Sequence, residues 1–111
     1  MAQVEGWVRV MPDAEVEEGT IYGFEVDGEE RILTRVEGHL CALDGICTHE
    51  FAELVEGEVE DDVLWCPLHG SGFNVHTGAA SNLPATTPLA TYDVRVDGGE
   101  VYVAQAPREQ D

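Results

Sequence analysis

Two short segments carry the same pair of metal-binding side chains, and they constrain this chain more than any other feature. Cys47 and His49 lie in "ICTHE", residues 46–50, while Cys66 and His69 lie in "CPLHG", residues 66–70, with sixteen residues between His49 and Cys66. Both segments fall between Asp44 and Thr91, where Gly and Pro interrupt any regular periodicity. So irregular a stretch in a small domain needs something besides strand pairing to order it, and a cofactor bound by both segments would do so.

Thiolate and imidazole ligands suit zinc as well as an iron–sulfur cluster, so the residue types alone do not choose between them. Zinc sites usually combine a closely spaced Cys pair with a closely spaced His pair around one ion. Here each segment is mixed, so that each loop can give its Cys to one iron and its His to another. The spacing therefore favours a two-iron centre, and a zinc-bound structural or interaction module stays open as an alternative.

The rest of the chain predicts an all-β fold in a single domain. Short runs rich in Val, Ile, Tyr and Thr are separated by Gly, Asp and Pro, and no apolar pattern at helical period persists. Asp27-Gly28 and Asp97-Gly98-Gly99 supply the positive φ angles of tight hairpins. We expect residues 11–19 to be a surface connection and the tail from Gln105 to fray. The expected strands are 6–11, 20–26, 30–36, 39–43, 62–65, 90–96 and 100–104.

The charge balance restricts the partners of the chain. Five Lys and Arg stand against 23 Asp and Glu in 111 residues, a formal net charge of −18. Nucleic acid and anionic membranes would repel such a surface, whereas a protein with a basic surface would be attracted to it. A solubility or salt-adapted surface explains the same charge. For the acidic stretch from Glu53 to Asp62, both a solvated face and a docking surface remain open.

Location can also be predicted from the sequence. The N-terminal residues lack the basic and apolar regions of a signal peptide, and no window approaches the roughly 20 apolar residues of a membrane span. We therefore expect a cytoplasmic protein without a membrane segment. In a reducing compartment, the Cys and His residues indicate a metal site rather than disulfides.

The pattern Cys-x-His, sixteen intervening residues, Cys-x-x-His resembles the Rieske family, and "CTHE" and "CPLHGSGFN" resemble its two cluster loops. The resemblance covers essentially the whole chain. It implies one [2Fe–2S] cluster per chain, with Cys47 and Cys66 on the inner iron and His49 and His69 on the outer iron. It also implies a Rieske fold, in which an antiparallel β-sheet base domain (residues 1–43 and 90–105) carries a small cluster-binding subdomain of two loops (about 44–89). "NLPATTPLATY" resembles the family's third loop, with Pro84 and Ala85 as the lid.

Departures from the respiratory-chain members of the family indicate which kind of Rieske protein this is. Those members carry two further cysteines joined as a disulfide, at the positions of Ala52 and Leu68 here. They also hydrogen-bond the cluster through a Ser and a Tyr; here Ser71 is kept, but Phe73 takes the place of the Tyr. Losing a hydroxyl donor destabilises the added electron, so we expect a potential in the lower part of the Rieske window of about −150 to +300 mV.

We expect no membrane anchor before the domain and no catalytic domain after it, and in this the chain is similar to the small ferredoxins of aromatic-ring dioxygenase systems. The resemblance implies a soluble one-electron carrier, not an enzyme, that passes electrons from a flavin-containing ferredoxin reductase to a terminal oxygenase. Both partners would carry basic docking surfaces. The alternative is a fixed small Rieske subunit of another oxidoreductase complex, such as a nitrite reductase.

The remaining Cys, His and aromatic residues are interpreted as structural. His39 and His76 have no metal-spaced partner, and Cys41 lies on an expected strand, where a free thiol behaves as a small buried hydrophobe. Trp7 and Trp65 are core anchors or edge packing. Of the two, we expect Trp65 to pack beside the cluster, because it precedes Cys66, and we expect Phe73 to shield the cluster.

Overall fold

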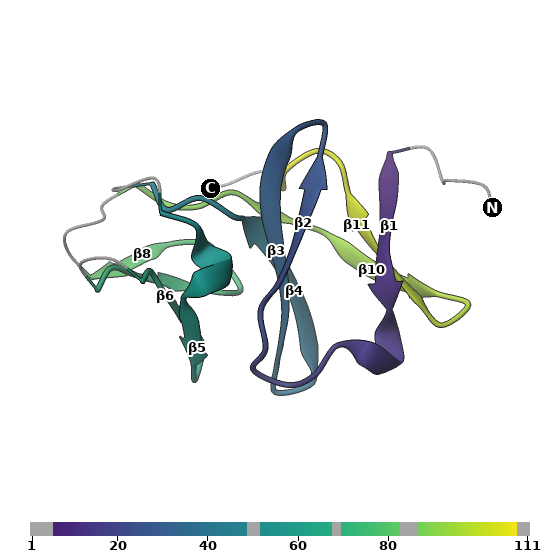
Figure 1. Ribbon diagram of the computed structural model, residues 1–111, viewed down its shortest axis with the longest axis horizontal. Coiled ribbons are helices and arrows are strands. Elements are labelled where there is room, and N and C mark those ends of the chain that lie inside the picture. Colours follow the sequence, from purple (N-terminus) through teal and green to yellow (C-terminus); the bar gives the residue numbers. More distant parts are fainter. Residues whose placement is uncertain (1–5, 49–51, 68–69, 83–86, 109–111) are drawn as a thin grey trace.

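A computed structural model describes residues 6–48, 52–67, 70–82 and 87–108, and its strands form three antiparallel sheets (Figure 1). The molecule is elongated, with extents of 42 × 25 × 25 Å. In the described residues, no helix is long and apolar enough to cross a membrane. The predicted all-β fold is confirmed.

The first sheet joins the two ends of the chain. It contains β1 (Trp7–Pro12), β10 (Val94–Asp97) and β11 (Glu100–Ala104) in the order β1-β11-β10. Gly98 and Gly99 form the turn between β10 and β11, with φ of 60° and 82°. This is the turn that the sequence predicts at residues 97–99.

The second sheet contains the longest strand, and its first three strands follow one another in consecutive hairpins. It contains β2 (Tyr22–Val26), β3 (Glu29–Val36), β4 (His39–Asp44) and β9 (Thr91–Tyr92), in the order β2-β3-β4-β9. Asp27 and Gly28 turn with φ of 52° and 85°, as predicted. The single strand predicted for residues 90–96 is wrong, because the chain changes sheets at Asp93: β9 pairs with β4 and β10 pairs with β11.

The third sheet lies inside the irregular region and was largely missed from the sequence. It contains β5 (Glu58–Glu60), β6 (Val63–Trp65), β7 (Gly72–Asn74) and β8 (Ala80–Asn82), in that order. Only β6 corresponds to a predicted strand. Strands of three residues are too short to show an alternating pattern, so periodicity could not reveal the others.

Two 3-10 helices and the C-terminal segment complete the described fold. They are η1 (Asp13–Glu15) and η2 (Leu54–Glu56). The surface connection predicted for residues 11–19 is wrong in part, because η1 forms there and Val16 is buried. The prediction of a frayed tail is wrong up to residue 108, because the Arg108 N–H donates to the Thr91 carbonyl at 2.7 Å. Residues 109–111 lie outside the described part.

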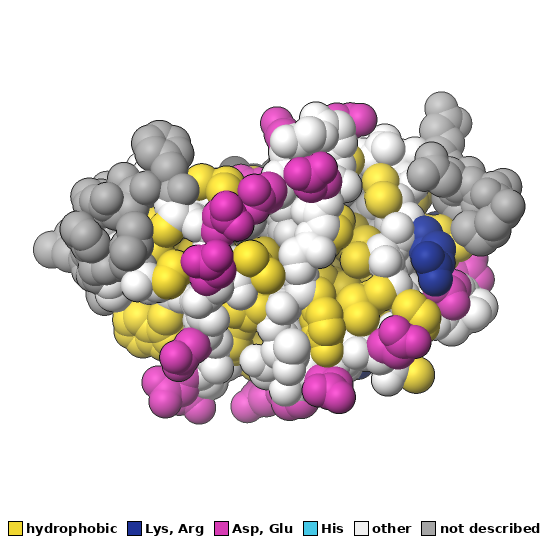
Figure 2. All heavy atoms as spheres, in the orientation of Figure 1, with side chains coloured by type: hydrophobic (Ala, Val, Ile, Leu, Met, Phe, Trp, Pro, Cys, Tyr) yellow, Lys and Arg dark blue, Asp and Glu magenta, His cyan; other side chains and the backbone are white. Residues whose placement is uncertain are grey.

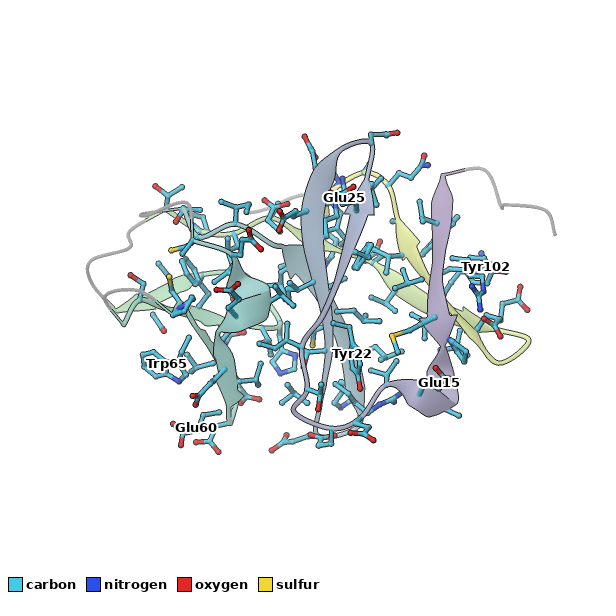
Figure 3. The ribbon with its side chains drawn as sticks, viewed as in Figure 1. Glu15, Tyr22, Glu25, Glu60, Trp65 and Tyr102 are labelled. Carbon is cyan, nitrogen blue, oxygen red and sulfur yellow. The ribbon has the colours of Figure 1, made fainter. Side chains whose placement is uncertain are left out.

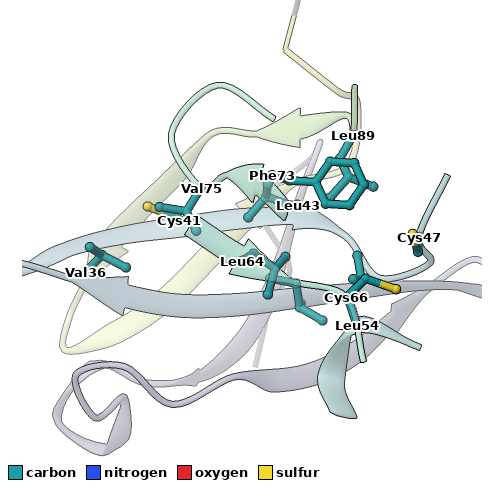
Figure 4. Close-up of a cluster of buried hydrophobic side chains, with 11 residues drawn as sticks. Val36, Cys41, Leu43, Cys47, Leu54, Leu64, Cys66, Phe73, Val75 and Leu89 are labelled. Atoms are coloured by element: carbon teal, nitrogen blue, oxygen red, sulfur yellow. The ribbon is translucent and has the colours of Figure 1, made fainter. Parts of the chain in front are cut away.

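The second sheet is buried on both faces. Alternate residues of β3 point to opposite sides, so Ile32 enters one core and Leu33 the other. The base core, between the first and second sheets, contains Val16, Leu33, Ala42, Tyr92, Val101 and Val103. The cysteine core, between the second and third sheets, contains Ile32, Val36, Cys41, Leu43, Cys47, Leu54, Leu64, Cys66, Phe73, Val75 and Leu89 (Figure 4).

Candidate metal centre

Cys47 follows β4 in a segment that folds back on itself. The Cys47 N–H donates to the Ala52 carbonyl at 2.9 Å, and Ile46 forms a β-bridge with Glu53. The Cys47 side chain is 0% exposed. Backbone pairing therefore closes the first loop at its base, and the Cys47 side chain points into the protein.

Cys66 follows β6, and its loop closes in the same way. The Cys66 N–H donates to the Ser71 carbonyl at 2.7 Å, so the segment between these residues is pinned at its base. Gly70 lies in this segment with φ of 73°, a conformation that most other residues disfavour. Both Cys66 and Ser71 are buried.

The two cysteines are not joined in a disulfide, and they lie at the same end of the cysteine core (Figure 4). His49 and His69 lie outside the described residues, as do Leu68, Pro84 and Ala85. The assignment of His49 and His69 as ligands, and of Pro84 and Ala85 as a lid, therefore stays a prediction.

The described part of the site fits a [2Fe–2S] cluster. Two thiols that are not joined in a disulfide converge from two separately closed loops, and thiolate is the ligand that iron–sulfur clusters require. Their burial keeps these ligands away from water, while the loop segments between the closing hydrogen bonds remain available for further ligands. Two loops held in this way can present ligands from both sides of one cluster.

Two hydrogen bonds that were not predicted hold the segments around the site together. Thr48, between Cys47 and His49 in the sequence, donates through its hydroxyl to the Thr87 carbonyl at 2.8 Å. This bond ties the first loop to the segment that follows residues 83–86. No sequence pattern reveals it, because a Thr followed by a polar residue is common in loops.

The second unpredicted bond lies where the first loop leaves β4. The Tyr92 hydroxyl donates to Asp44 Oδ1 at 2.6 Å, and the Arg31 guanidinium lies 4.0 Å over the Tyr92 ring. Burial, together with the bond to Asp44, raises the pKa of Tyr92. The phenol therefore stays a donor, and it fixes the end of β4 to β9.

Phe73 and Trp65 lie on the strands beside the second loop. Phe73 is 0% exposed, pairs with Leu64 across β6 and β7, and packs in the same core as Cys47 and Cys66. It brings a ring without a hydroxyl into this core. Trp65 is partly buried next to Cys66, and its Nε1 is buried without a hydrogen-bond partner in the described residues.

The three Cys and His residues interpreted as structural come together elsewhere. His76 Nδ1 lies 3.6 Å from Cys41 Sγ, its Nε2 lies 3.2 Å from Asp62 Oδ1, and its ring meets that of His39 edge-on at 6.4 Å. Burial, then the charge of Asp62, raises the pKa of Cys41 to about 11, so its thiol is protonated at neutral pH. Across the described ranges, no group of three or more His, Cys, Asp or Glu is arranged to hold a metal ion.

Comparisons with known proteins show to which family the chain is similar. The Rieske [2Fe-2S] domain family matches residues 6–93. The chain is 37% identical over 99 residues to the ferredoxin component of a naphthalene 1,2-dioxygenase system from Pseudomonas aeruginosa, covering 89% of this chain and 95% of that one. It is 42% identical over 94 residues to a 3-phenylpropionate/cinnamic acid dioxygenase ferredoxin subunit from Shigella flexneri serotype 5b, covering 83% and 87%.

A solved structure extends the likeness to three dimensions. A chain from a complex of reduced oxygenase and oxidized ferredoxin in carbazole 1,9a-dioxygenase superposes with a TM-score of 0.90 at 36% identity. The match covers 96% of this chain and 100% of that one. The relatives are electron-transfer components rather than oxygenases, which confirms the prediction of a carrier with one [2Fe–2S] cluster, a reductase and an oxygenase partner. The chain belongs to the Rieske [2Fe–2S] family, and its fold is that of the Rieske ferredoxins.

Proposed function

We propose that this protein is a soluble, cytoplasmic one-electron carrier of an aromatic-ring dioxygenase system, passing electrons from a flavin-containing reductase to a terminal oxygenase. The observation that carries the proposal is the likeness to ferredoxin components over nearly the full length of both chains. The relatives serve different aromatic substrates, so the carrier itself does not determine the ring. That choice belongs to the oxygenase.

We assign Cys47 and Cys66 to the inner iron of the cluster and His49 and His69 to the outer iron. A cluster bound in this way supplies a site that accepts and releases one electron, at potentials of about −150 to +300 mV. The burial of both cysteines supports their place on the inner side. The protein's own part is to fix the two loops through the bonds Cys47 to Ala52 and Cys66 to Ser71, so that little reorganises when the charge changes.

The potential of the cluster should lie in the lower part of that window. Phe73 contributes no hydroxyl to the core that holds Cys47 and Cys66, so one donor that could stabilise the reduced state is missing. Potentiometry of the purified protein tests this directly. A value near the upper end of the window would contradict it.

We also propose the division into a base (residues 1–43 and 90–105) and a cluster-binding subdomain (about 44–89). Support comes from strand pairing, since among the described residues the strands of the third sheet pair only with one another and all lie within residues 58–82. The cysteine core nevertheless joins this subdomain to the second sheet. The two parts therefore share side-chain packing while keeping separate backbone ladders.

The charge of the described surface supports partners with basic docking faces. All five basic residues are arginines, and each has a carboxylate oxygen within 3.5 Å, so little positive charge remains to repel a basic partner. Carboxylates outnumber the arginines by 23 to five, so a large excess of negative charge remains. The ion pairs are Arg9–Glu100, Arg31–Glu29, Arg35–Asp13, Arg95–Asp97 and Arg108–Asp93.

Reconstitution with a flavin-containing reductase and a terminal oxygenase of an aromatic-ring dioxygenase system tests the function. We expect the reductase to reduce the cluster with a nicotinamide cofactor, and the oxygenase to reoxidise it while hydroxylating an aromatic substrate. Product formation that is equally fast without the carrier would contradict the proposal. Isolation of the protein only in a permanent complex with one oxidoreductase would instead identify a fixed subunit.

A further inference from the structure

A shallow groove runs between an edge of the second sheet and an edge of the third. One wall is the segment that leads into β2, and the other is the end of η2 together with β5. In Figure 2, hydrophobic side chains lie between β5 and β2 and are bordered by acidic ones. The residues that line the groove are Gly19, Thr20, Ile21, Val55, Gly57, Glu58 and Val59.

The floor of the groove is apolar and rigid. Ile21, Val55 and Val59 are partly buried and pack against the cysteine core. A Cβ added to Gly23 would lie 3.3 Å from Val55 Cγ2, so η2 closes onto β2 at this point. The contact between η2 and β2 therefore closes the groove near Gly23, and the groove is open along Gly19 to Ile21.

Both walls end in strand edges. β5 pairs with β6 alone and β2 pairs with β3 alone, within the residues that the structure describes. Backbone N–H and C=O groups on such edges accept an added strand, which is how many proteins bind an extended segment of a partner.

The rim of the groove is strongly acidic. Glu58 and Glu60 are both exposed on β5 and share one face of it, because they are two residues apart, and Glu56 is exposed at the end of η2. The Arg35 carbonyl accepts a hydrogen bond from the Gly19 N–H. The Arg35 guanidinium donates to the Val16 carbonyl and to Asp13 Oδ1. No basic side chain lines the groove.

We propose that this groove binds an extended, basic segment of an electron-transfer partner, which adds a strand to the edge of β5. Apolar side chains of that segment would meet Val55 and Val59, and its Lys or Arg side chains would meet Glu58 and Glu60. A second copy of this chain is a poor occupant, because its own β5 would bring like charges opposite one another. This inference rests on the proposed carrier function.

The position of β5 links this contact to the redox site. Glu58 pairs with Trp65 across β5 and β6, and Trp65 immediately precedes Cys66. A partner strand on β5 thus lies against the hairpin that leads into the second cluster loop. Figure 3 shows Glu60 and Trp65 close together at this end of the molecule.

The test uses the oxidised holoprotein and a synthetic peptide of about nine residues in which Lys and Val alternate, a length that spans a typical strand. We expect binding that weakens between about 20 mM and 500 mM NaCl, because salt screens the rim charges. Hydrogen exchange measured by mass spectrometry should slow in peptides covering residues 19–21 and 57–60. A scrambled peptide with all Lys residues grouped at one end should bind at least about fivefold more weakly, since it cannot match the alternation of the strand.

A pair of charge reversals identifies the site. Glu58→Lys should weaken peptide binding about tenfold, whereas Glu15→Lys, an equal change of charge on η1, should change it less than about twofold. Four results would each contradict the proposed binding site. They are equal losses of binding in both variants, no binding of the peptide, protection from exchange elsewhere on the chain, and dimerisation through β5 without the peptide. The visible spectrum of the cluster is recorded throughout, because its retention separates failure of the groove from failure of the carrier assignment.

Discussion

The second and third sheets share one core yet are built in different ways. β3 and β4 of the second sheet are eight and six residues long, and they alternate between two buried faces. Every strand of the third sheet has three residues; the loop of Cys66 lies between β6 and β7, and the loop of Cys47 lies between β4 and η2, before β5 begins. The longer strands hold themselves in place by side-chain burial, whereas the short ones depend on close backbone contacts and on the cofactor.

Loss of the cluster should produce the largest difference in behaviour between the second and third sheets. In a Cys66→Ser variant, which lacks one of the two proposed inner ligands, we expect amide exchange in residues 58–82 to accelerate by about a hundredfold or more, because metal-binding energy is also folding energy for such loops. Exchange in β3 and β11 should change far less. Hydrogen exchange by mass spectrometry measures both in one experiment.

Cys41→Ser is the matched control, because Cys41 lies in the same core but has no assigned role at the cluster. This variant should keep the cluster spectrum. Equal acceleration in all three sheets of Cys66→Ser would show that the fold responds as one unit, contrary to the comparison.

A glycine in the third-sheet region offers the next largest effect. A Cβ at Gly78 would lie 2.0 Å from the Leu89 carbonyl oxygen, and Gly78 has φ of +80°. We expect Gly78→Ala to lower the free energy of unfolding by about 3 kcal/mol or more, since a steric clash adds to backbone strain. Denaturant titration followed through the cluster absorbance gives the value.

Gly98→Ala in the first sheet provides the contrast. Gly98 has φ of +60° but nothing within 4 Å of an added Cβ, so only the strain of about 1 kcal/mol applies. If the two alanine variants lost equal stability, close packing around Gly78 would not be what holds this region.

The contact between β4 and β9 should have a smaller effect. Tyr92→Phe removes the donor to Asp44 and should cost about 1–2 kcal/mol of unfolding free energy, because the carboxylate loses a charge-assisted hydrogen bond. Tyr102→Phe, at a buried tyrosine of β11, is the matched control and should cost less. Equal losses would mean that the Tyr92 hydroxyl contributes nothing specific at the base of the first loop.

The Cys41 thiol predicts a modest dependence on pH. Its pKa is raised from 9.0 to about 11 in the folded protein, so the folded state keeps a proton that the unfolded state releases. This contribution is complete below pH 9 and is lost as the pH rises toward 11. The stability of the wild type relative to Cys41→Ala should therefore fall across that interval and level off above it, as measured by urea unfolding at each pH. A constant difference from pH 8 to 11 would show that the thiol titrates normally.

The long strands could be located from the sequence for physical reasons, and the sequence also indicated that Cys47 and Cys66 lie in one site. The run of β-favouring residues in β3 and the Asp27-Gly28 turn are local signals, and the two mixed Cys/His segments predict a shared cofactor site. By contrast, β5 and β8 are set by tertiary pairing, which leaves no period to read. The same holds for the bond from Thr48 to Thr87, since its partners are 39 residues apart and its acceptor is a backbone carbonyl.

The boundary between β9 and β10 shows a further limit. Residues 90–96 have the composition of one strand, yet the chain leaves the second sheet at Asp93 to join the first. Sheet membership depends on which neighbours are available, and composition does not record it. The tail was misjudged for the same reason, because Arg108 is held by Thr91 and Asp93 from the same switch region.

Pulsed electron paramagnetic resonance of the reduced protein, labelled with ¹⁵N-histidine, tests the ligand set most directly. If Cys47, His49, Cys66 and His69 bind one [2Fe–2S] cluster, two imidazole nitrogens will couple strongly to the unpaired electron. His39→Gln and His76→Gln will leave both couplings unchanged, while replacing His49 or His69 will remove the two-nitrogen signal. A reduced cluster that shows no coupled histidine nitrogen, or keeps both couplings in the His49 and His69 variants, would contradict the assignment.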